Sequence, residues 1–133
     1  MKLKDKVAII TGAGRGIGKA IAVAFASEGA RVVLASRTVQ ELDESLSGIQ
    51  ALGGEGIVVP TDVSKRADVE KLVRMTAQRF AAVHILVNNA GIFGPIGPAY
   101  ENDIEEWVST IHVNFIGAFL CCRAVLPYML RQG

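Results

Sequence analysis

A glycine-rich segment near the start of the chain constrains the fold more than any other feature. Residues 11–18 read Thr-Gly-Ala-Gly-Arg-Gly-Ile-Gly, which places four glycines within seven positions. Because glycine costs backbone entropy in a helix or strand without adding packing, these residues indicate a turn of special geometry. An apolar run at residues 7–10 precedes the turn as a predicted buried strand, and Ile17, Ile21 and Phe25 follow it at helical spacing. A strand, turn and helix in this order present backbone N–H groups and a helix N-terminus to a phosphate.

The spacing of the glycines shows which kind of phosphate-binding loop they resemble. The common dinucleotide fingerprint has glycines at relative positions one, three and six, but the sixth position counted from Gly12 is Ile17. The pattern Thr-Gly-x-x-x-Gly-Ile-Gly instead resembles the short-chain dehydrogenase/reductase family, whose members bind NAD or NADP in such a loop. A glycine-rich turn without a ligand is the alternative interpretation. The loop residues expected to bind the cofactor are Gly12, Gly14, Arg15, Gly16, Ile17 and Gly18.

The composition is that of a globular domain, with half of the residues hydrophobic and a fifth charged. A net charge of +1 provides no long-range field to attract nucleic acid or an anionic membrane, which argues against both partners.

Cys121 and Cys122 are adjacent in a helical pattern, where a disulfide between them is geometrically difficult, so both are expected as buried residues in a reducing compartment. The charged N-terminus lacks the apolar core of a signal peptide, which predicts a cytoplasmic protein.

Residues 113–130 are apolar and nearly long enough to span a membrane. The segment contains Asn114, Arg123 and Pro127, and a central arginine alone costs about 2.5–3.5 kcal/mol on insertion scales. A buried or interfacial helix is therefore expected, and membrane contact is the minor alternative.

Short apolar runs alternate with amphipathic helical patterns along the chain. Strands separated by helices imply a parallel sheet built from right-handed crossovers. We therefore expect an α/β fold, the first half of a doubly wound Rossmann sheet with strand order 3-2-1-4 and helices on both faces. The ligand crevice belongs at the carboxyl ends of the strands, beside the switch point between strands 1 and 4. The predicted strands span residues 7–10, 31–36, 57–59 and 85–87.

Capping signals predict where the later helices begin. Thr38, with Glu41 three residues later, fits the capping-box pattern for the second helix. Ser64 is the expected N-cap of the third helix, which ends near residue 80. Asp103, again followed three residues later by Glu106, begins a long helix.

The residues that end the second predicted strand indicate which nicotinamide cofactor is bound. An NAD site of this architecture usually has an acidic side chain here, which binds the ribose hydroxyls. Here Ser36 is followed by Arg37, whose planar fork suits a 2′-phosphate, and Arg15 is placed to approach the same phosphate from the glycine turn. Two arginines and no acid predict NADP, with NADPH preferred over NADH. The alternative is that both arginines are ordinary solvated charges.

Two further segments match positions of the family's cofactor site. Asp62 and Val63 match an Asp-Val pair that contacts the adenine in the family, and an Asx turn is the alternative. The family's Asn-Asn-Ala-Gly stretch after the fourth strand implies that Asn89, Ala90 and Gly91 lie beside the adenosine ribose, with a simple turn as the alternative.

Asn114 is the one catalytic residue that the resemblance implies. It matches the asparagine of the family's Asn-Ser-Tyr-Lys tetrad, which holds the water of a proton relay. A buried amide must be paired, so the alternative is a core asparagine bonded to a neighbouring backbone. The family's tyrosine is followed by a lysine four residues later, but Ile104 follows Tyr100 at that distance and Gln132 follows Tyr128.

The resemblance therefore covers only the cofactor half of the family's fold, so residues 1–133 are expected to form an NADP-binding domain that is incomplete at its C-terminus. The chain alone is predicted to be inactive. The whole protein is expected to move hydride between a nicotinamide and a small carbonyl or alcohol substrate, as a homodimer or homotetramer. A non-catalytic dinucleotide-sensing module is the alternative.

His84 and His112 have no Cys or His nearby at metal-ligand spacing, which predicts no metal site. The apolar side chains expected to lack a covering element are Phe115, Phe119, Cys122 and Leu126.

Overall fold

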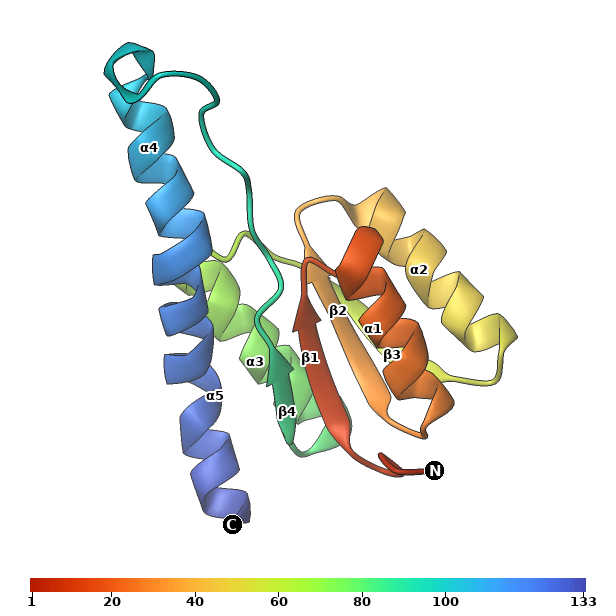
Figure 1. The fold of residues 1–133 in the computed structure, drawn as a ribbon. Helices are drawn as coiled ribbons and strands as arrows, with labels where there is room; N and C mark the ends of the chain where they lie inside the picture. Colours follow the sequence, from red (N-terminus) through yellow and green to blue (C-terminus); the bar gives the residue numbers. More distant parts are fainter.

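The computed structural model describes residues 1–133 as a four-stranded parallel sheet flanked by helices (Figure 1). The strand order is β3-β2-β1-β4, which confirms the predicted α/β fold and its topology. The second and fourth predicted strands have the observed bounds, while the first extends to Thr11 and the third begins at Glu55. The strands are β1 (Val7–Thr11), β2 (Arg31–Ser36), β3 (Glu55–Pro60) and β4 (Ile85–Val87).

Each face of the sheet has its own apolar core. On one face, α1 (Gly16–Ser27) and α2 (Val39–Ala51) pack on strand residues such as Ile10 and Leu34. On the other face, α3 (Arg66–Phe80) and α5 (Gly117–Gln132) pack on strand residues such as Ile9. Figure 1 shows the two pairs of helices on opposite sides of the sheet. Because successive strand side chains point to opposite faces, continuous apolar strands are needed to supply both cores.

The helix starts are partly as predicted. Asp103 accepts a hydrogen bond from the Glu106 N–H at 3.1 Å, so the expected cap of the long helix is confirmed. Thr38 does precede α2, but its side chain makes no capping bond. The prediction for Ser64 is wrong, because its N–H and hydroxyl both donate to the Asp62 carboxylate and α3 begins at Arg66.

The long helix is less buried than the sequence predicted. It runs from Ile104 to Gln132 as α4 (Ile104–Ile111), a π-helical segment (His112–Ile116) and α5. By length and hydropathy alone this 29-residue helix meets the criterion for a membrane span, and only 17% of its most apolar window is buried. No residue of α4 is buried. The buried residues of α5 are Gly117, Cys121 and Val125.

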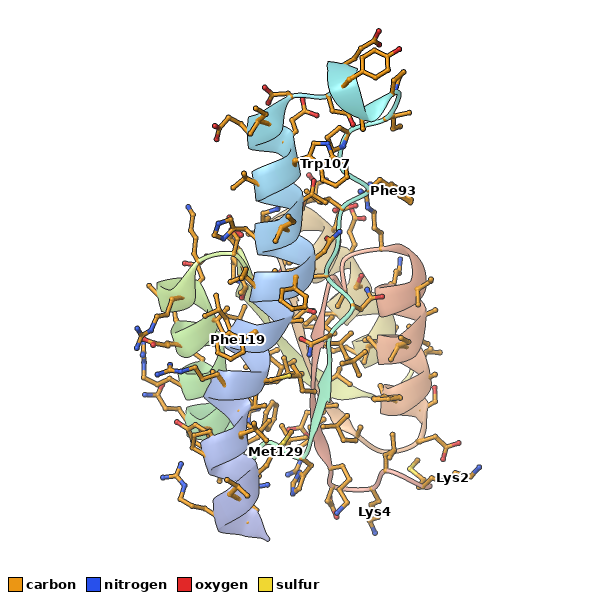
Figure 2. All side chains as sticks on the ribbon, turned by 60° about the vertical axis from the view of Figure 1, so that its left-hand side comes forward. Lys2, Lys4, Phe93, Trp107, Phe119 and Met129 are labelled. Atoms are coloured by element: carbon orange, nitrogen blue, oxygen red, sulfur yellow. The ribbon has the colours of Figure 1, made fainter.

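The other face of this helix carries uncovered apolar side chains, as predicted. Phe115, Phe119 and Leu126 are 72%, 58% and 48% exposed. Figure 2 shows Phe119 on the helix face turned away from the sheet. Cys122 is also exposed, so the expectation of two buried cysteines is wrong for this residue. Burial raises the pKa of the Cys121 thiol to about 11, which keeps it protonated.

Side chains as well as backbone groups form the hydrogen bonds just before β4. The His84 Nδ1 accepts a hydrogen bond from the Val7 N–H at 2.9 Å, and the His84 backbone N–H donates to the Val7 carbonyl oxygen at 2.9 Å. The Gln132 carboxamide accepts from the Val83 N–H at 2.9 Å and donates to the Val83 carbonyl at 2.8 Å. His84 therefore continues the hydrogen bonding between β1 and β4 by one residue before β4 begins.

Candidate functional site

A cavity of about 430 Å³ lies at the carboxyl ends of the strands, where the crevice was predicted. It is bounded by the turn after β1, the ends of β2 and β3, and the segment after β4. Among the residues expected to bind the cofactor, only Gly18 does not line it. Those that do are Gly12, Gly14, Arg15, Gly16, Ile17, Ser36, Arg37, Asp62, Val63, Asn89, Ala90 and Gly91.

Two glycines of the turn are required by close contacts. Gly12 has a φ of +64°, and a Cβ there would lie 2.9 Å from the Asn89 Nδ2. At Gly18 a Cβ would overlap the carbonyl oxygen of Gly12, so this residue lets α1 begin directly against the turn. Gly18 therefore shapes the cavity from behind rather than lining it.

The N-terminus of α1 is open toward the cavity. Its N-cap residue, Arg15, is extended and makes no capping hydrogen bond, and the first turn carries no acidic side chain. At Gly16 a Cβ would meet nothing within 4 Å, so there is open space beside this first residue of the helix. The first N–H groups of a helix have no partner within the helix, so an uncapped terminus binds anions.

Thr11 joins the turn after β1 to the segment after β4. Its side chain is buried, and its hydroxyl accepts hydrogen bonds from the Asn89 and Ala90 N–H groups, each at 3.0 Å. The Asn89 side chain in turn donates to the Gly12 carbonyl at 3.2 Å. Thr11 was not among the residues predicted to bind the cofactor, although its fixed place before the glycines was a usable signal.

The end of the cavity after β2 is more mixed in charge than the sequence suggested. Arg15 and Arg37 are both exposed and neither forms an ion pair, so their charges are available to an anion. Glu41, from the first turn of α2, lines the same cavity. A Cβ at Gly14 would lie 3.0 Å from the Glu41 Cβ and 3.3 Å from the Ser36 Oγ. The strand end itself carries no acid, as predicted from Ser36 and Arg37, but Glu41 brings a carboxylate to this part of the cavity from α2.

Asp62 combines the two roles considered for it. Its carboxylate accepts the Ser64 hydroxyl at 2.6 Å and the Ser64 N–H at 3.0 Å, which is an Asx turn. The hydroxyl contact is the main cause of the lowered pKa of Asp62; partial burial opposes it, and the Arg37 charge contributes. Asp62 therefore stays ionised while lining the cavity.

Asn114 does not line the cavity and is exposed, so the expectation of a buried amide is wrong. It lies in the π-helical segment, where its Oδ1 accepts from the Ile92 N–H at 2.8 Å and its Nδ2 donates to the Ile92 carbonyl at 2.7 Å. It thus holds the segment that follows Gly91. These contacts match the alternative of an asparagine bonded to a neighbouring backbone, and its catalytic role stays a prediction.

Several residues that line the cavity were not singled out from the sequence. Phe93, next to Ile92, is fully exposed beside the cavity (Figure 2). The remaining ones share no motif and come from the strand end of β2, the residue before α2, the loops after β3 and β4, and the π-helical segment, so their position depends on the fold. They are Ala35, Thr38, Thr61, Ile92 and Val113.

Known proteins match nearly the whole chain in sequence. A sequence model of the short-chain dehydrogenase family matches residues 6–133. An uncharacterized oxidoreductase from Listeria monocytogenes is 42% identical over 132 residues, which are 99% of this chain and 53% of that protein. One from Staphylococcus aureus is 41% identical over 131 residues, 98% of this chain and 55% of that protein. The chain thus spans about half the length of the curated relatives it matches.

Solved structures share the fold as well as the sequence. A metagenomic short-chain oxidoreductase in complex with NADP has a TM-score of 0.95 and 36% identity, covering 99% of this chain and 60% of that one. A short-chain dehydrogenase/reductase from Burkholderia phymatum in complex with NAD has a TM-score of 0.94 and 39% identity, covering 99% of this chain and 47% of that one. The chain therefore belongs to the short-chain dehydrogenase/reductase family and corresponds to the N-terminal Rossmann part of its members.

Proposed function

We propose that the chain is the cofactor-binding part of an NADP(H)-dependent oxidoreductase acting on a small carbonyl or alcohol substrate. The observation that supports this most is the pair of arginines, Arg15 and Arg37, which border the cavity without any ion pair. A dianionic 2′-phosphate suits two such guanidinium groups, whereas an unphosphorylated ribose does not need them.

The residues present fit a dinucleotide. The uncapped α1 N-terminus and the glycine turn would hold the pyrophosphate, because the first N–H groups of a helix have no partner within it and no side chain caps this helix. Asp62 and Val63 would border the adenine, and residues 89–91 would border the adenosine ribose. When bound, the nicotinamide supplies or accepts the hydride, and the protein orients it.

Proton transfer requires groups beyond those of this chain. Asn114 is the one member of the family's tetrad that the sequence matches, and no Tyr-x-x-x-Lys pair is present. We therefore propose that residues 1–133 alone bind the cofactor without turning over a substrate. The exposed apolar face of the long helix supports a homodimer or homotetramer, and we place the protein in the cytoplasm.

The related structures include one complex with NADP and one with NAD, so they do not indicate which cofactor this chain prefers. The preference is therefore inferred from the charges that line the cavity. We expect Arg37→Asp to weaken NADPH binding by about tenfold or more, because charge reversal removes a partner of the 2′-phosphate and repels it. NADH binding should change by less than about threefold. Fluorescence titration of the chain with both cofactors measures this.

Arg74→Asp is the matched control, because Arg74 is an exposed, unpaired arginine of α3 outside the cavity. It makes the same change in net charge, so both cofactors should bind it as they bind the unsubstituted chain. An equal loss of NADPH and NADH binding in Arg37→Asp would contradict the assignment of NADP.

A further inference from the structure

A second cavity, of about 320 Å³, lies between α3 and α5 and shares no lining residue with the cofactor cavity. The two helices lie side by side on one face of the sheet (Figures 1 and 2). We call this cavity the α3–α5 groove; it is lined by residues from 66–74 of α3 and from 120–128 of α5. Its floor is apolar, because Val69 and Val73 are buried there and Ala124 is partly buried beside them.

Charged side chains stand on both rims of the groove. Arg66, Glu70 and Arg74 follow one another at four-residue spacing, which places them on the same face of α3. Arg123 stands on the opposite rim, on α5. The Arg66 Nε donates to the Glu70 Oε1 at 2.7 Å, so these two charges compensate each other. Arg74 and Arg123 form no ion pair, and each rim therefore keeps one uncompensated positive charge.

The Glu70 carboxylate shows that the arginine charges converge on this groove. The hydrogen bond from Arg66 is the main cause of its lowered pKa, and the charges of Arg123 and Arg74 lower the pKa further, while desolvation opposes them. All four side chains are exposed, so solvent screens these attractions. Because Glu70 is bonded to Arg66 and pairs with neither of the other arginines, an anion that contacts both of them gains interactions that the chain itself does not make.

The size of the groove favours a small molecule over a protein partner. The lining residues of α3 span two helical turns, which is a length of about 12 Å. Stable protein interfaces bury on the order of 1,000 Å² or more, which a groove of this length does not supply. Its volume lies at the lower end of the range of small-molecule sites, about 300–1,000 Å³. An apolar floor between two positive charges suits a short molecule with an apolar body and an anionic head group.

We propose that the α3–α5 groove is a binding site for a small amphipathic carboxylate. The two carboxylate oxygens bind Arg74 and Arg123, one guanidinium from each rim, because a planar guanidinium matches a carboxylate in shape and charge. The apolar body covers the floor at Val73 and Ala124, where it removes apolar surface from water. The site is separate from the cofactor cavity, so it does not depend on the proposed function.

Isothermal titration of the chain with octanoate tests this site, and 1-octanol is the uncharged probe of the same length. Octanoate should bind with a dissociation constant of about 0.1–1 mM, and 1-octanol at least about threefold more weakly. Arg123→Gln should weaken octanoate binding about threefold to fivefold and leave 1-octanol binding unchanged. Glu70→Gln should tighten octanoate binding about twofold to threefold, because it removes a negative charge and releases Arg66 from its ion pair.

Lys71→Gln is the matched control. Lys71 is exposed on α3 and does not line the groove, so its substitution removes one positive charge and should leave octanoate affinity unchanged. The three substituted residues are all exposed, so the fold should remain intact, and circular dichroism checks this. A loss of folding cannot account for the expected changes of opposite sign in Arg123→Gln and Glu70→Gln.

Three results would overturn the proposal. The first is that the unsubstituted chain does not bind octanoate, or binds 1-octanol equally well. The second is an equal loss of octanoate affinity in Arg123→Gln and Lys71→Gln, which would be a response to net charge alone. The third concerns the long apolar helix, which meets the criterion for a membrane span. If the chain sediments with phosphatidylglycerol vesicles through Arg123 but does not bind octanoate, the groove contacts a lipid surface instead.

Discussion

The two sides of the cavity are held in place by different kinds of side chain. The side formed by the turn after β1 and its neighbours is held by buried hydroxyl groups: Thr11 bonds the segment after β4, and Ser45 donates from α2 to the Gly14 carbonyl at 3.2 Å. Further along the segment after β4, Ile92 is held by the carboxamide of Asn114, an exposed residue of the long helix. The carboxamide of Gln132, which is also exposed, pairs with Val83 before β4.

The difference teaches where the geometry of the site is fixed most firmly. A buried donor or acceptor that loses its partner suffers the full desolvation cost, whereas an exposed one is satisfied by water. The side around the glycine turn is therefore rigid within this chain. The side after β4 depends on a helix that buries few of its own residues, so it is the softer of the two.

The largest expected effect is that of Gly18→Ala, which adds a Cβ where it would overlap the Gly12 carbonyl oxygen. Overpacking of this kind costs about 1–3 kcal/mol of unfolding free energy, and NADPH affinity should fall by more than tenfold because the turn itself must move. Thermal denaturation and NADPH titration measure the two effects.

Gly48→Ala provides the comparison for this change, because Gly48 lies inside α2 and a Cβ there meets nothing within 4 Å. It should stabilise the chain by about 0.5–1 kcal/mol through helix propensity and leave cofactor binding unchanged. Similar behaviour of the two variants would remove the argument for a rigid glycine turn.

A smaller effect is expected from Asn114→Ala and Gln132→Ala, each of which removes two hydrogen bonds to backbone groups. Each should lower the unfolding free energy by about 1 kcal/mol, because water replaces much of what is lost. Amide hydrogen exchange should speed up at Ile92 in the first variant and at Val83 in the second.

Cofactor affinity should separate these two variants. It should fall only in Asn114→Ala, because Ile92 lines the cavity and Val83 does not. An effect of Asn114→Ala on stability as large as that of Gly18→Ala would show that the side after β4 is not the softer one.

The smallest expected effect is a pH dependence from His84. Burial and the nearby Lys6 charge lower the pKa of this imidazole from 6.5, so the folded chain binds its proton less well than the unfolded chain does. The stabilisation is therefore fully present above the unfolded-state pKa of about 6.5 and declines as the pH falls toward the folded value. Protonation also removes the acceptor of the Val7 N–H.

His84→Asn is designed to keep an acceptor near the same place without a titrating group. We expect urea denaturation between pH 7 and pH 5 to show a smaller loss of stability in this variant than in the unsubstituted chain. Identical losses would mean that His84 does not contribute to the pH dependence.

Local patterns predicted the sheet well because the strands are continuous apolar runs bounded by turn residues. The run at Arg31–Ser36 has the observed bounds, and the turn between α1 and β2 contains Gly29 with a φ of +90°. The order of the strands also followed from the alternation of strand and helix. The position of the cavity then followed from the topology.

Side-chain hydrogen-bond partners could not be predicted in the same way. Which of several possible partners a side chain bonds depends on which groups the fold brings close to it. Ser64 bonds Asp62 instead of capping α3, and the capping-box pattern assigned Glu41 to Thr38 although its carboxylate lies beside Gly14. Asn114 was expected inside a regular helix, but the π-helical segment interrupts the 3.6-residue repeat and changes which side chains face the sheet.

The hydroxyl of Thr11 also determines when in folding the site can form. Its partners Val87, Asn89 and Ala90 lie 76, 78 and 79 residues further along the chain. Contacts of such long sequence separation form late, because the entropy of closing the intervening loop must be overcome first. The phosphate-binding turn therefore reaches its final geometry only when more than half of the chain has been folded around it, although its own residues are nearly contiguous.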